Sequence, residues 1–504
     1  MQRLGELPLL VVLMVLTGLA MLVPAFHAEV LQAHRVARAF VYAAIMVFVL
    51  AGMLGIVIRP ALRRPGARHQ LLTVALPYLV LPPLLALPML PEEGGGLQLR
   101  DAWFDMLAAF TTTGATIFGP PDLSPSVHLW RAMVGWLGGL YILVVALAVL
   151  MPLNLGGMEV LSGRTPGRGS GAAQITEVAG FGARLMRFSL RIAPLYAGMT
   201  LALWILLLLA GEDNLIALCH AMSTLSTSGI SPVGGLAAGR AGWPGEVLVF
   251  AFLLLALSRW PLTRALGLQR AQPLWHDPEL RAAALLLAVV PMVIVLRLWW
   301  GAAQAGAGAD IAALLRAWWS ELFMALSFLT TTGFESANWP QALAWAHQPA
   351  AAAAFWGLAI LGGGVATTAG GIRLLRVVAL FRHSRDELER LIHPNLVTGQ
   401  YGAARQIARQ GVALAWVFFT LFGLSLAATT GLLSLTGQGF ENAMIMSIAA
   451  LTNTAPVVSI LPELGQPWAM VDLPGRIVLG AAMVLGRLDI LAVLVLFLPD
   501  TWRG

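Results

Sequence analysis

A bulky apolar residue followed by hydroxyl or amide residues and then glycine or alanine occurs four times in this chain, each time after a short apolar run. The copies are Phe110-Thr111-Thr112-Thr113-Gly114, Leu225-Ser226-Thr227-Ser228-Gly229, Leu329-Thr330-Thr331-Thr332-Gly333 and Leu451-Thr452-Asn453-Thr454-Ala455. Such loops can turn backbone carbonyl oxygens toward an axis, where they replace the water around a dehydrated cation. Glycine suits this task because it adopts positive φ without a Cβ clash. Copies about 100 to 120 residues apart predict a four-part ring of loops around an ion pore.

The predicted ion ligands are the last three residues of each copy, and the upstream residues agree between copies as well. The ligands are Thr112, Thr113, Gly114, Thr227, Ser228, Gly229, Thr331, Thr332, Gly333, Asn453, Thr454 and Ala455. Six residues before the glycine position stand the small residues Ala108, Ser223, Ser327 and Ala449, each preceded by a large apolar residue. One such loop alone is ordinary loop composition. The fourfold recurrence instead predicts a short helix that packs in the same way before each loop.

The composition indicates a membrane protein. Hydrophobic residues make up 58% of the chain and charged residues 11%, against about 25% charged in soluble domains, and the mean hydropathy is +0.79. The net charge of +6 comes without a basic run interleaved with aromatics, so we expect no nucleic acid partner. The single cysteine, Cys219, excludes an internal disulfide and a multi-cysteine metal site.

Apolar stretches of about 20 residues predict ten membrane spans. They lie near residues 8–26, 39–58, 70–90, 129–152, 190–210, 245–260, 281–300, 352–380, 405–436 and 471–498. Because each loop motif falls between two of the last eight spans, we divide the chain into an N-terminal pair of transmembrane helices and four pore repeats. Their boundaries are 1–68, 69–165, 166–275, 276–395 and 396–504.

Arginine clusters predict the orientation of these spans. They fall within residues 59–68, 164–187, 264–270 and 373–390, so they recur after every second span and belong in the cytoplasm together with both termini. The loops then open outward, where acidic residues would raise the local cation concentration. These are Glu92, Glu93, Asp101, Asp105, Glu212, Asp213, Asp310, Glu321 and Glu335, although acids are also ordinary in exposed loops.

A glycine-rich segment interrupts the predicted span near 352–380. Its small residues are Gly362, Gly363, Gly364, Thr367, Thr368, Gly370 and Gly371, between two apolar stretches that are each too short to span a membrane. Irregular backbone at membrane depth persists only where it is buried in protein or lines a watery cavity. We therefore expect this segment to cross the pore beneath the loops, with a flexible cytosolic connector as the alternative.

Arg487 lies well inside the last apolar span. A central arginine costs about 2.5–3.5 kcal/mol on insertion scales, so it should face water or a partner rather than lipid. The alternative is a side chain that reaches back to the inner surface. Asp489 is two residues away and therefore points elsewhere on a helix, so we do not expect it to pair with Arg487.

Together these features resemble the Trk/Ktr/HKT superfamily of potassium transporters, and within it the TrkH-like membrane subunits. The resemblance rests on the loops, the glycine-rich segment, Trp130-Arg131 through Trp136-Leu137-Gly138-Gly139, residues 385–395 (RDELERLIHPN) and Gly486-Arg487-Leu488. It implies an all-α polytopic membrane protein with four membrane helix, pore helix, filter loop and membrane helix repeats around a pseudo-fourfold pore. It also implies a homodimer with a cytoplasmic nucleotide-binding, TrkA-like regulatory subunit. The glycine-rich segment would be the gate, and Arg487 would oppose cations below the filter.

We therefore expect potassium uptake across a bacterial inner membrane, with K⁺ as the transported ion, lipid as surroundings and no organic cofactor. A sodium-permeable or proton-coupled relative is the alternative within transport, and a membrane enzyme with a buried polar site is the alternative of another class. No phosphate-binding loop with lysine and no nucleophile elbow occurs in the sequence, so an enzyme is disfavoured.

Ala455 departs from the other three copies. If the fourth loop took the same left-handed backbone, alanine would cost about 1–2 kcal/mol there, and Pro456 favours an extended residue before it. The sequence thus predicts a different fourth wall and a weaker preference for potassium over sodium.

Overall fold

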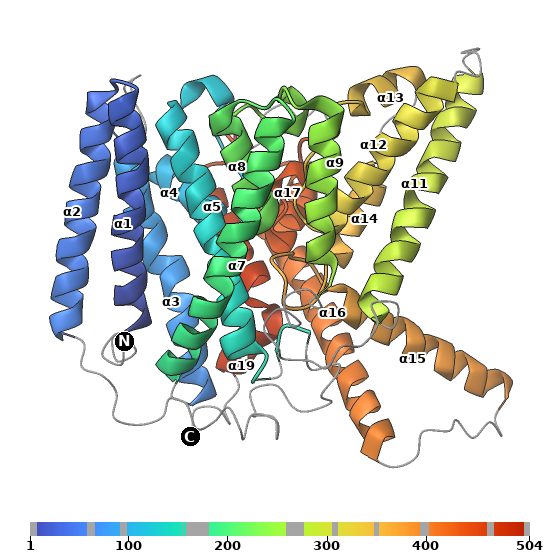
Figure 1. The fold of residues 1–504 in the computed structure, drawn as a ribbon. Helices are drawn as coiled ribbons and strands as arrows, with labels where there is room; N and C mark the ends of the chain where they lie inside the picture. Colours follow the sequence, from blue (N-terminus) through green and yellow to red (C-terminus); the bar gives the residue numbers. More distant parts are fainter. Residues whose placement is uncertain are drawn as a thin grey trace.

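The chain is an all-α protein with several helices of membrane-spanning length. The computed structural model describes residues 8–57, 66–90, 98–153, 155–157, 181–258, 277–304, 311–346, 352–393, 403–460 and 468–497, and these ranges hold helices without strands. Eight helices among these residues are long and apolar enough to cross a membrane. The predicted polytopic all-α fold is therefore confirmed (Figure 1).

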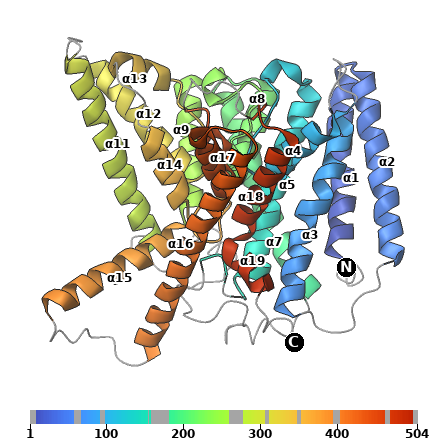
Figure 2. The same cartoon turned by 180° about the vertical axis from the view of Figure 1, so that it is seen from behind.

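Two antiparallel helices, α1 (Leu9–Val30) and α2 (His34–Val57), come first and stand together at one edge of the molecule (Figures 1 and 2). Small residues bring them close, because a Cβ added to Gly18 would lie 2.8 Å from the Phe48 ring. Their outer faces expose large apolar side chains such as Leu19 and Ile45, as expected of lipid-facing helices.

A pattern of a long helix, a helix that ends at a loop motif, and a second helix then occurs four times. In chain order these helices are α3 (Ala67–Ala86), α4 (Leu99–Phe110), α5 (Pro125–Val145); α7 (Phe181–Leu209), α8 (Asn214–Ser226), α9 (Gly242–Leu253); α11 (Pro278–Gln304), α12 (Ile311–Leu329), α14 (Ala352–Leu361) with α15 (Leu374–Ile392); and α16 (Ala403–Leu435), α17 (Phe440–Thr452), α18 (Leu473–Leu488) with α19 (Ile490–Phe497). A further short helix, α13 (Trp339–Ala346), follows the third motif. Figure 2 shows α17 near the middle, between the longer helices.

Helix α12, which leads into the third loop motif, differs from the prediction. Helices α4, α8 and α17 have 12, 13 and 13 residues, but α12 has 19 and is itself long enough to span a membrane. The prediction of a short helix is therefore wrong for this copy. Residues 311–329 contain no glycine or proline that would delay the start of the helix.

In every copy, the helix that follows the loop motif departs from regular α-helix toward its C-terminal end. Helix α5 continues as a π-helix (η4, Ala146–Leu150), and α9 continues as a 3-10 helix (η7, Leu254–Leu257). The glycine-rich segment 362–371 separates α14 from α15, as predicted. A break that the sequence did not predict separates α18 from α19 at Asp489, which has φ of 73°. Helix α15 then projects away from the rest of the molecule (Figures 1 and 2).

Candidate functional site

The same backbone hydrogen bond closes each of the four loops. The residue just before the glycine position donates its N–H to the carbonyl of the small residue five positions earlier, at 2.8 to 3.0 Å. The pairs are Thr113 to Ala108, Ser228 to Ser223, Thr332 to Ser327, and Thr454 to Ala449. These acceptors are the small residues that recur in the sequence. The predicted repetition of helix and loop is therefore confirmed at the level of individual bonds.

Two residues in each of the first three loops have left-handed backbone. The predicted glycines do so, with φ of 76° at Gly114, 64° at Gly229 and 79° at Gly333. The residue two positions earlier does so in all four loops, with φ of 51° to 58° at Thr112, Thr227, Thr331 and Asn453. Sequence reasoning included these residues among the ion ligands but missed their left-handed backbone, because threonine, which is β-branched, rarely adopts positive φ. Asparagine tolerates this conformation, so Asn453 was the available signal.

Hydroxyl side chains of the loops turn back onto the preceding helices. The residue three before the glycine position donates its hydroxyl to the carbonyl four residues earlier, at 2.8 to 2.9 Å, in every loop. These donors are Thr111, Ser226, Thr330 and Thr452. This arrangement holds these four hydroxyl side chains against the helices that precede the loops.

The loops contact one another in sequence and close into a ring. A Cβ on Gly114 would overlap the Ser228 carbonyl oxygen, and a Cβ on Gly229 would overlap that of Thr332. A Cβ on Gly333 would lie 2.7 Å from Pro456. The fourth loop returns to the first, because the Ala455 N–H donates to the Thr113 carbonyl at 2.8 Å. Only glycine fits at the first three positions, for reasons of space as well as φ.

The fourth loop differs from the others, but not through strain at Ala455. Ala455 lacks positive φ and instead begins a 3-10 turn, Ala455–Val457. Asn453 joins the loop to its neighbours by donating its side-chain amide to the Thr113 hydroxyl at 3.0 Å and to the Met483 carbonyl at 2.9 Å. The predicted difference of the fourth wall is thus present, while its premise of a left-handed alanine is wrong.

The glycine-rich segment forms a compact hairpin at the break between α14 and α15. Ile372 and Arg373 donate their N–H groups to the carbonyls of Ile360 and Leu361, both at 2.9 Å. A Cβ on Gly362 would overlap the Gly370 carbonyl oxygen, so the two arms of the segment meet where only glycine fits. Residues 362–370 are all buried. The alternative of a flexible cytosolic connector is therefore wrong.

This segment lies directly against three of the four loops. The Thr368 hydroxyl donates to the Leu225 carbonyl at 3.3 Å, and the Gly370 N–H donates to the Thr331 hydroxyl at 2.8 Å. A Cβ on Gly370 would overlap the Thr452 carbonyl oxygen. Its other side is fastened by Glu279, which accepts the Val365 N–H at 2.8 Å. The segment therefore closes the ring from one side.

Arg487 is buried at the centre of this assembly, with 3% of its surface exposed. Its guanidinium donates to the Thr368 carbonyl at 2.6 Å and lies near Tyr78 and Tyr196, from α3 and α7. The alternative in which the side chain reaches the inner surface is wrong. Asp489 does not pair with Arg487, as predicted, but with Arg376 of α15 at 2.6 Å.

The acidic residues do not form the predicted common vestibule. Asp105 is buried and pairs with Arg131 at 2.7 Å, Glu321 is fully buried in α12, and Glu212 accepts the Arg240 N–H at 2.9 Å. Burial in helix contacts, which sequence position does not reveal, explains the difference. Asp101, Asp213 and Glu335 do retain exposed surface, whereas Glu92, Glu93 and Asp310 lie outside the described residues.

Glu335 follows the third loop by two residues, and it accepts a hydrogen bond from the Ser459 hydroxyl at 2.8 Å. It thereby links the ends of the third and fourth loops. Partial burial raises the pKa of the Glu335 carboxyl, and the bond from Ser459 opposes this increase.

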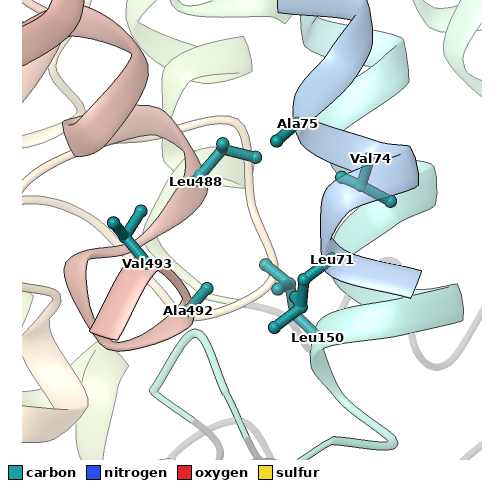
Figure 3. Close-up of a pocket in the computed structure, with 7 residues that line it drawn as sticks. All are labelled: Leu71, Val74, Ala75, Leu150, Leu488, Ala492 and Val493. Atoms are coloured by element: carbon teal, nitrogen blue, oxygen red, sulfur yellow. The ribbon is translucent and has the colours of Figure 1, made fainter. Parts of the chain in front are cut away.

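The part of the chain that the structure describes holds no cluster of three or more histidine, cysteine, aspartate or glutamate residues suited to a metal ion. A crevice is lined by apolar side chains of α3, η4, α18 and α19 (Figure 3). Leu71, Val74 and Leu488 are among them, and none of its lining residues could act as an acid, base or nucleophile.

Comparisons with known proteins agree with this geometry. A family profile named TrkH and described as a cation transport protein matches residues 250–502. The chain is 28% identical to the Trk system potassium uptake protein TrkH of Escherichia coli K12 over 443 residues, which cover 87% of this chain and 86% of that protein. It is 29% identical to the protein of the same name from Halomonas elongata, over 96% of both. The crystal structure of the potassium transporter TrkH from Vibrio parahaemolyticus matches all of both chains with a TM-score of 0.79 at 24% identity, and so supports the fold.

Proposed function

Because the chain belongs to the TrkH family of cation transport proteins, we propose that it mediates potassium uptake through the ring of four loops. The relatives named above are potassium uptake proteins of Trk systems, and the chain spans most of their length. The observation that carries the proposal is the closed ring, in which each loop contacts the next and the first hydroxyl of each loop bonds back to the preceding helix. A ring of inward carbonyls can replace the hydration shell of K⁺.

The filter ligands in this proposal are the carbonyls of the predicted residues, from Thr112 to Gly114 and at the matching positions of the other loops. The glycine-rich segment is the gate, because it lies against three loops and must move before an ion can leave the filter. Arg487 holds the gate through Thr368 and places a positive charge below the filter, which opposes cation passage in the closed state.

We further propose a homodimer in a bacterial inner membrane, with both termini in the cytoplasm and a TrkA-like nucleotide-binding subunit acting on the gate. The helix pair 1–68 and the repeats 69–165, 166–275, 276–395 and 396–504 are the corresponding units. Both described ends of the chain lie on the side opposite α13, in keeping with this topology (Figure 1). The protein acts as a transporter and not as an enzyme, in line with the names of its relatives.

A sodium-permeable relative is the second candidate, favoured by the fourth loop. Its Ala455 N–H occupies the Thr113 carbonyl, so that carbonyl is shared between the ring and a passing ion. Weaker coordination of the ion at one wall would reduce the difference in permeability between K⁺ and Na⁺.

The proposal is tested by expressing the chain, with a matched regulatory subunit, in a bacterium that lacks potassium uptake. Growth at low external potassium is expected, and its absence despite confirmed membrane expression would count against the proposal. Reversal potentials of the purified protein in liposomes, with potassium on one side and sodium on the other, then separate the two candidates.

A further inference from the structure

Glu246 of α9 is a buried carboxylate that binds the third loop from both sides. It is 1% exposed and accepts hydrogen bonds from three donors. The Trp319 indole N–H donates to Oε2 at 2.8 Å, the Ser336 hydroxyl lies 3.1 Å from both oxygens, and the Ala337 N–H donates to Oε1 at 2.7 Å. Trp319 belongs to α12, which leads into the loop, and Ser336 follows Gly333 by three residues. One side chain therefore ties the entry and the exit of this loop together.

The tryptophan in this arrangement is held in place by aromatic neighbours on the same face of α9. The Trp319 ring lies 5.8 Å from that of Trp243 and 5.5 Å from that of Phe250, measured between centroids. Residues 243, 246 and 250 share one face of a helix. The indole N–H thus has a fixed direction toward Glu246, and α12 cannot shift relative to α9 without breaking this bond.

The other loops lack this arrangement. At the positions that match Trp319, counted from the glycine, stand Arg100, Leu215 and Glu441, and at those that match Ser336 stand Ile117, Pro232 and Val458. The third loop alone therefore combines these two donors. Sequence reasoning did not single out Glu246, because it precedes Gly333 of the third loop by 87 residues.

The charge of Glu246 is not balanced by an ion pair among the described residues. Its hydrogen-bond partners are all neutral N–H or O–H donors, and both oxygens accept, as expected of a carboxylate. A negative charge in a low-dielectric interior acts over a longer range than one in water. It therefore attracts a cation in the nearby ring.

We propose that Glu246 is a positioning and selectivity-determining residue of the filter, which fixes the third loop and supplies a buried negative charge behind it. This inference rests on the proposed function as a cation pathway. Since the third loop contacts both the second and the fourth, its position sets the width of the ring on two sides. A ring held at one width favours the ion whose size it fits, and the negative charge of Glu246 behind it favours cations.

The test compares three single variants in liposomes by reversal potential under a potassium and sodium gradient. Glu246→Gln removes the charge, Ser336→Ala removes one donor, and Trp319→Phe removes the other while the charge stays. We expect Glu246→Gln to lower the permeability ratio of potassium to sodium about tenfold, because hydrogen bonds to a charged group are the strongest and this variant weakens all of them. The two donor variants each remove one donor and should lower the ratio less. Glu212→Gln is the control, because Glu212 is also buried and accepts backbone N–H groups but contacts no loop residue in the bonds described.

The outcomes are distinguishable. If the unaltered protein carries no potassium, the proposed function fails. If the unaltered protein carries potassium, the inference about Glu246 is overturned when its permeability ratio is unchanged in Ser336→Ala, in Trp319→Phe and in Glu246→Gln, the last where that variant folds. A change in Glu212→Gln as large as that in the Glu246 and donor variants would also overturn it, since the effect would then be one of general stability.

Discussion

At the scale of single residues, the ring depends on backbone conformations that only some side chains permit. Glycine at three positions was predictable, because a motif that must turn a carbonyl inward needs positive φ. The left-handed threonines were not predictable, since their conformation is imposed by the bond that closes each loop rather than by their own preference. Strain of this kind is kept only where the surroundings fix it, and it is common at functional sites.

The glycine positions differ in what they tolerate. Gly229→Ala places a Cβ against the Thr332 carbonyl at a φ of 64°, and should reduce potassium flux about tenfold or more.

Ala455→Gly should change the permeability ratio by less than about twofold, because Ala455 is already free of left-handed strain. Flux and reversal potential in liposomes measure both. A large gain in selectivity for Ala455→Gly would restore the explanation based on strain.

Glu335 should make uptake sensitive to mild acid. Its raised pKa means that it takes up a proton at a higher pH than an ordinary glutamate, so the negative charge between the third and fourth loops is lost early as the outer pH falls. We expect uptake by the unaltered protein to decline in this range. Uptake by the Glu335→Gln variant should be lower at neutral pH and should change less with pH. Asp213→Asn, at an exposed acid paired with Arg240, is the control. An identical pH profile for Glu335→Gln and the unaltered protein would contradict this role.

At the scale of elements, composition predicted the break in the third copy but not the break in the fourth. Ten residues rich in glycine between two short apolar stretches leave little other choice at membrane depth. The break at Asp489 involves a single residue within an apolar run, and its only local signal is that aspartate favours the start of a helix, where Asp489 accepts the Leu491 N–H at 3.1 Å. Asp489 also pairs with Arg376 from another helix, and such a long-range contact cannot be predicted from local pattern.

The glycine-rich segment should act as a barrier. Removing residues 363–369 deletes the contacts with Leu225 and the anchor of Arg487 at Thr368, so ions leaving the ring meet less obstruction. Flux should increase several-fold and depend less on the regulatory subunit. Radioactive rubidium uptake into liposomes, with and without that subunit, measures this. Lower or unchanged flux in a monodisperse deletion protein would refute a gating role.

Arg487 should limit conductance through both its charge and its bond to the segment. A unit charge about 10 Å from an ion contributes about 2 kcal/mol at an effective dielectric constant of about 20, so Arg487→Ala should increase conductance roughly tenfold. Arg487→Lys keeps the charge and should remain closer to the unaltered protein. Single-channel or liposome flux recordings compare the two. Equal conductance for all three proteins would mean that the side chain is only structural.

At the scale of the whole molecule, one chain supplies all four walls, and this permits each wall to differ. A ring of identical subunits would repeat every contact, but here Glu246 binds residues on both sides of the third loop, and Asn453 joins the fourth loop to the first. The sequence predicted the ring and its order, because the motifs recur at regular spacing. It could not predict which contacts would be unique, since these join residues from different copies.

The inner side of the molecule is joined by the ion pair between Arg376 and Asp489. Both side chains are almost fully buried, and the Arg376 guanidinium also lies 3.7 Å from the centre of the Phe418 ring on α16. Removing one member of a buried pair leaves the other charge without compensation, which typically costs about 3–5 kcal/mol. Arg376→Met should therefore lower the thermal unfolding temperature in detergent markedly, although it keeps the apolar contact with Phe418. Adding Asp489→Asn removes the stranded charge and should recover part of that loss, because asparagine can still accept the Leu491 N–H. If Arg376→Met unfolds at the same temperature as the unaltered protein, the pair does not stabilise the junction of α15 with α18 and α19.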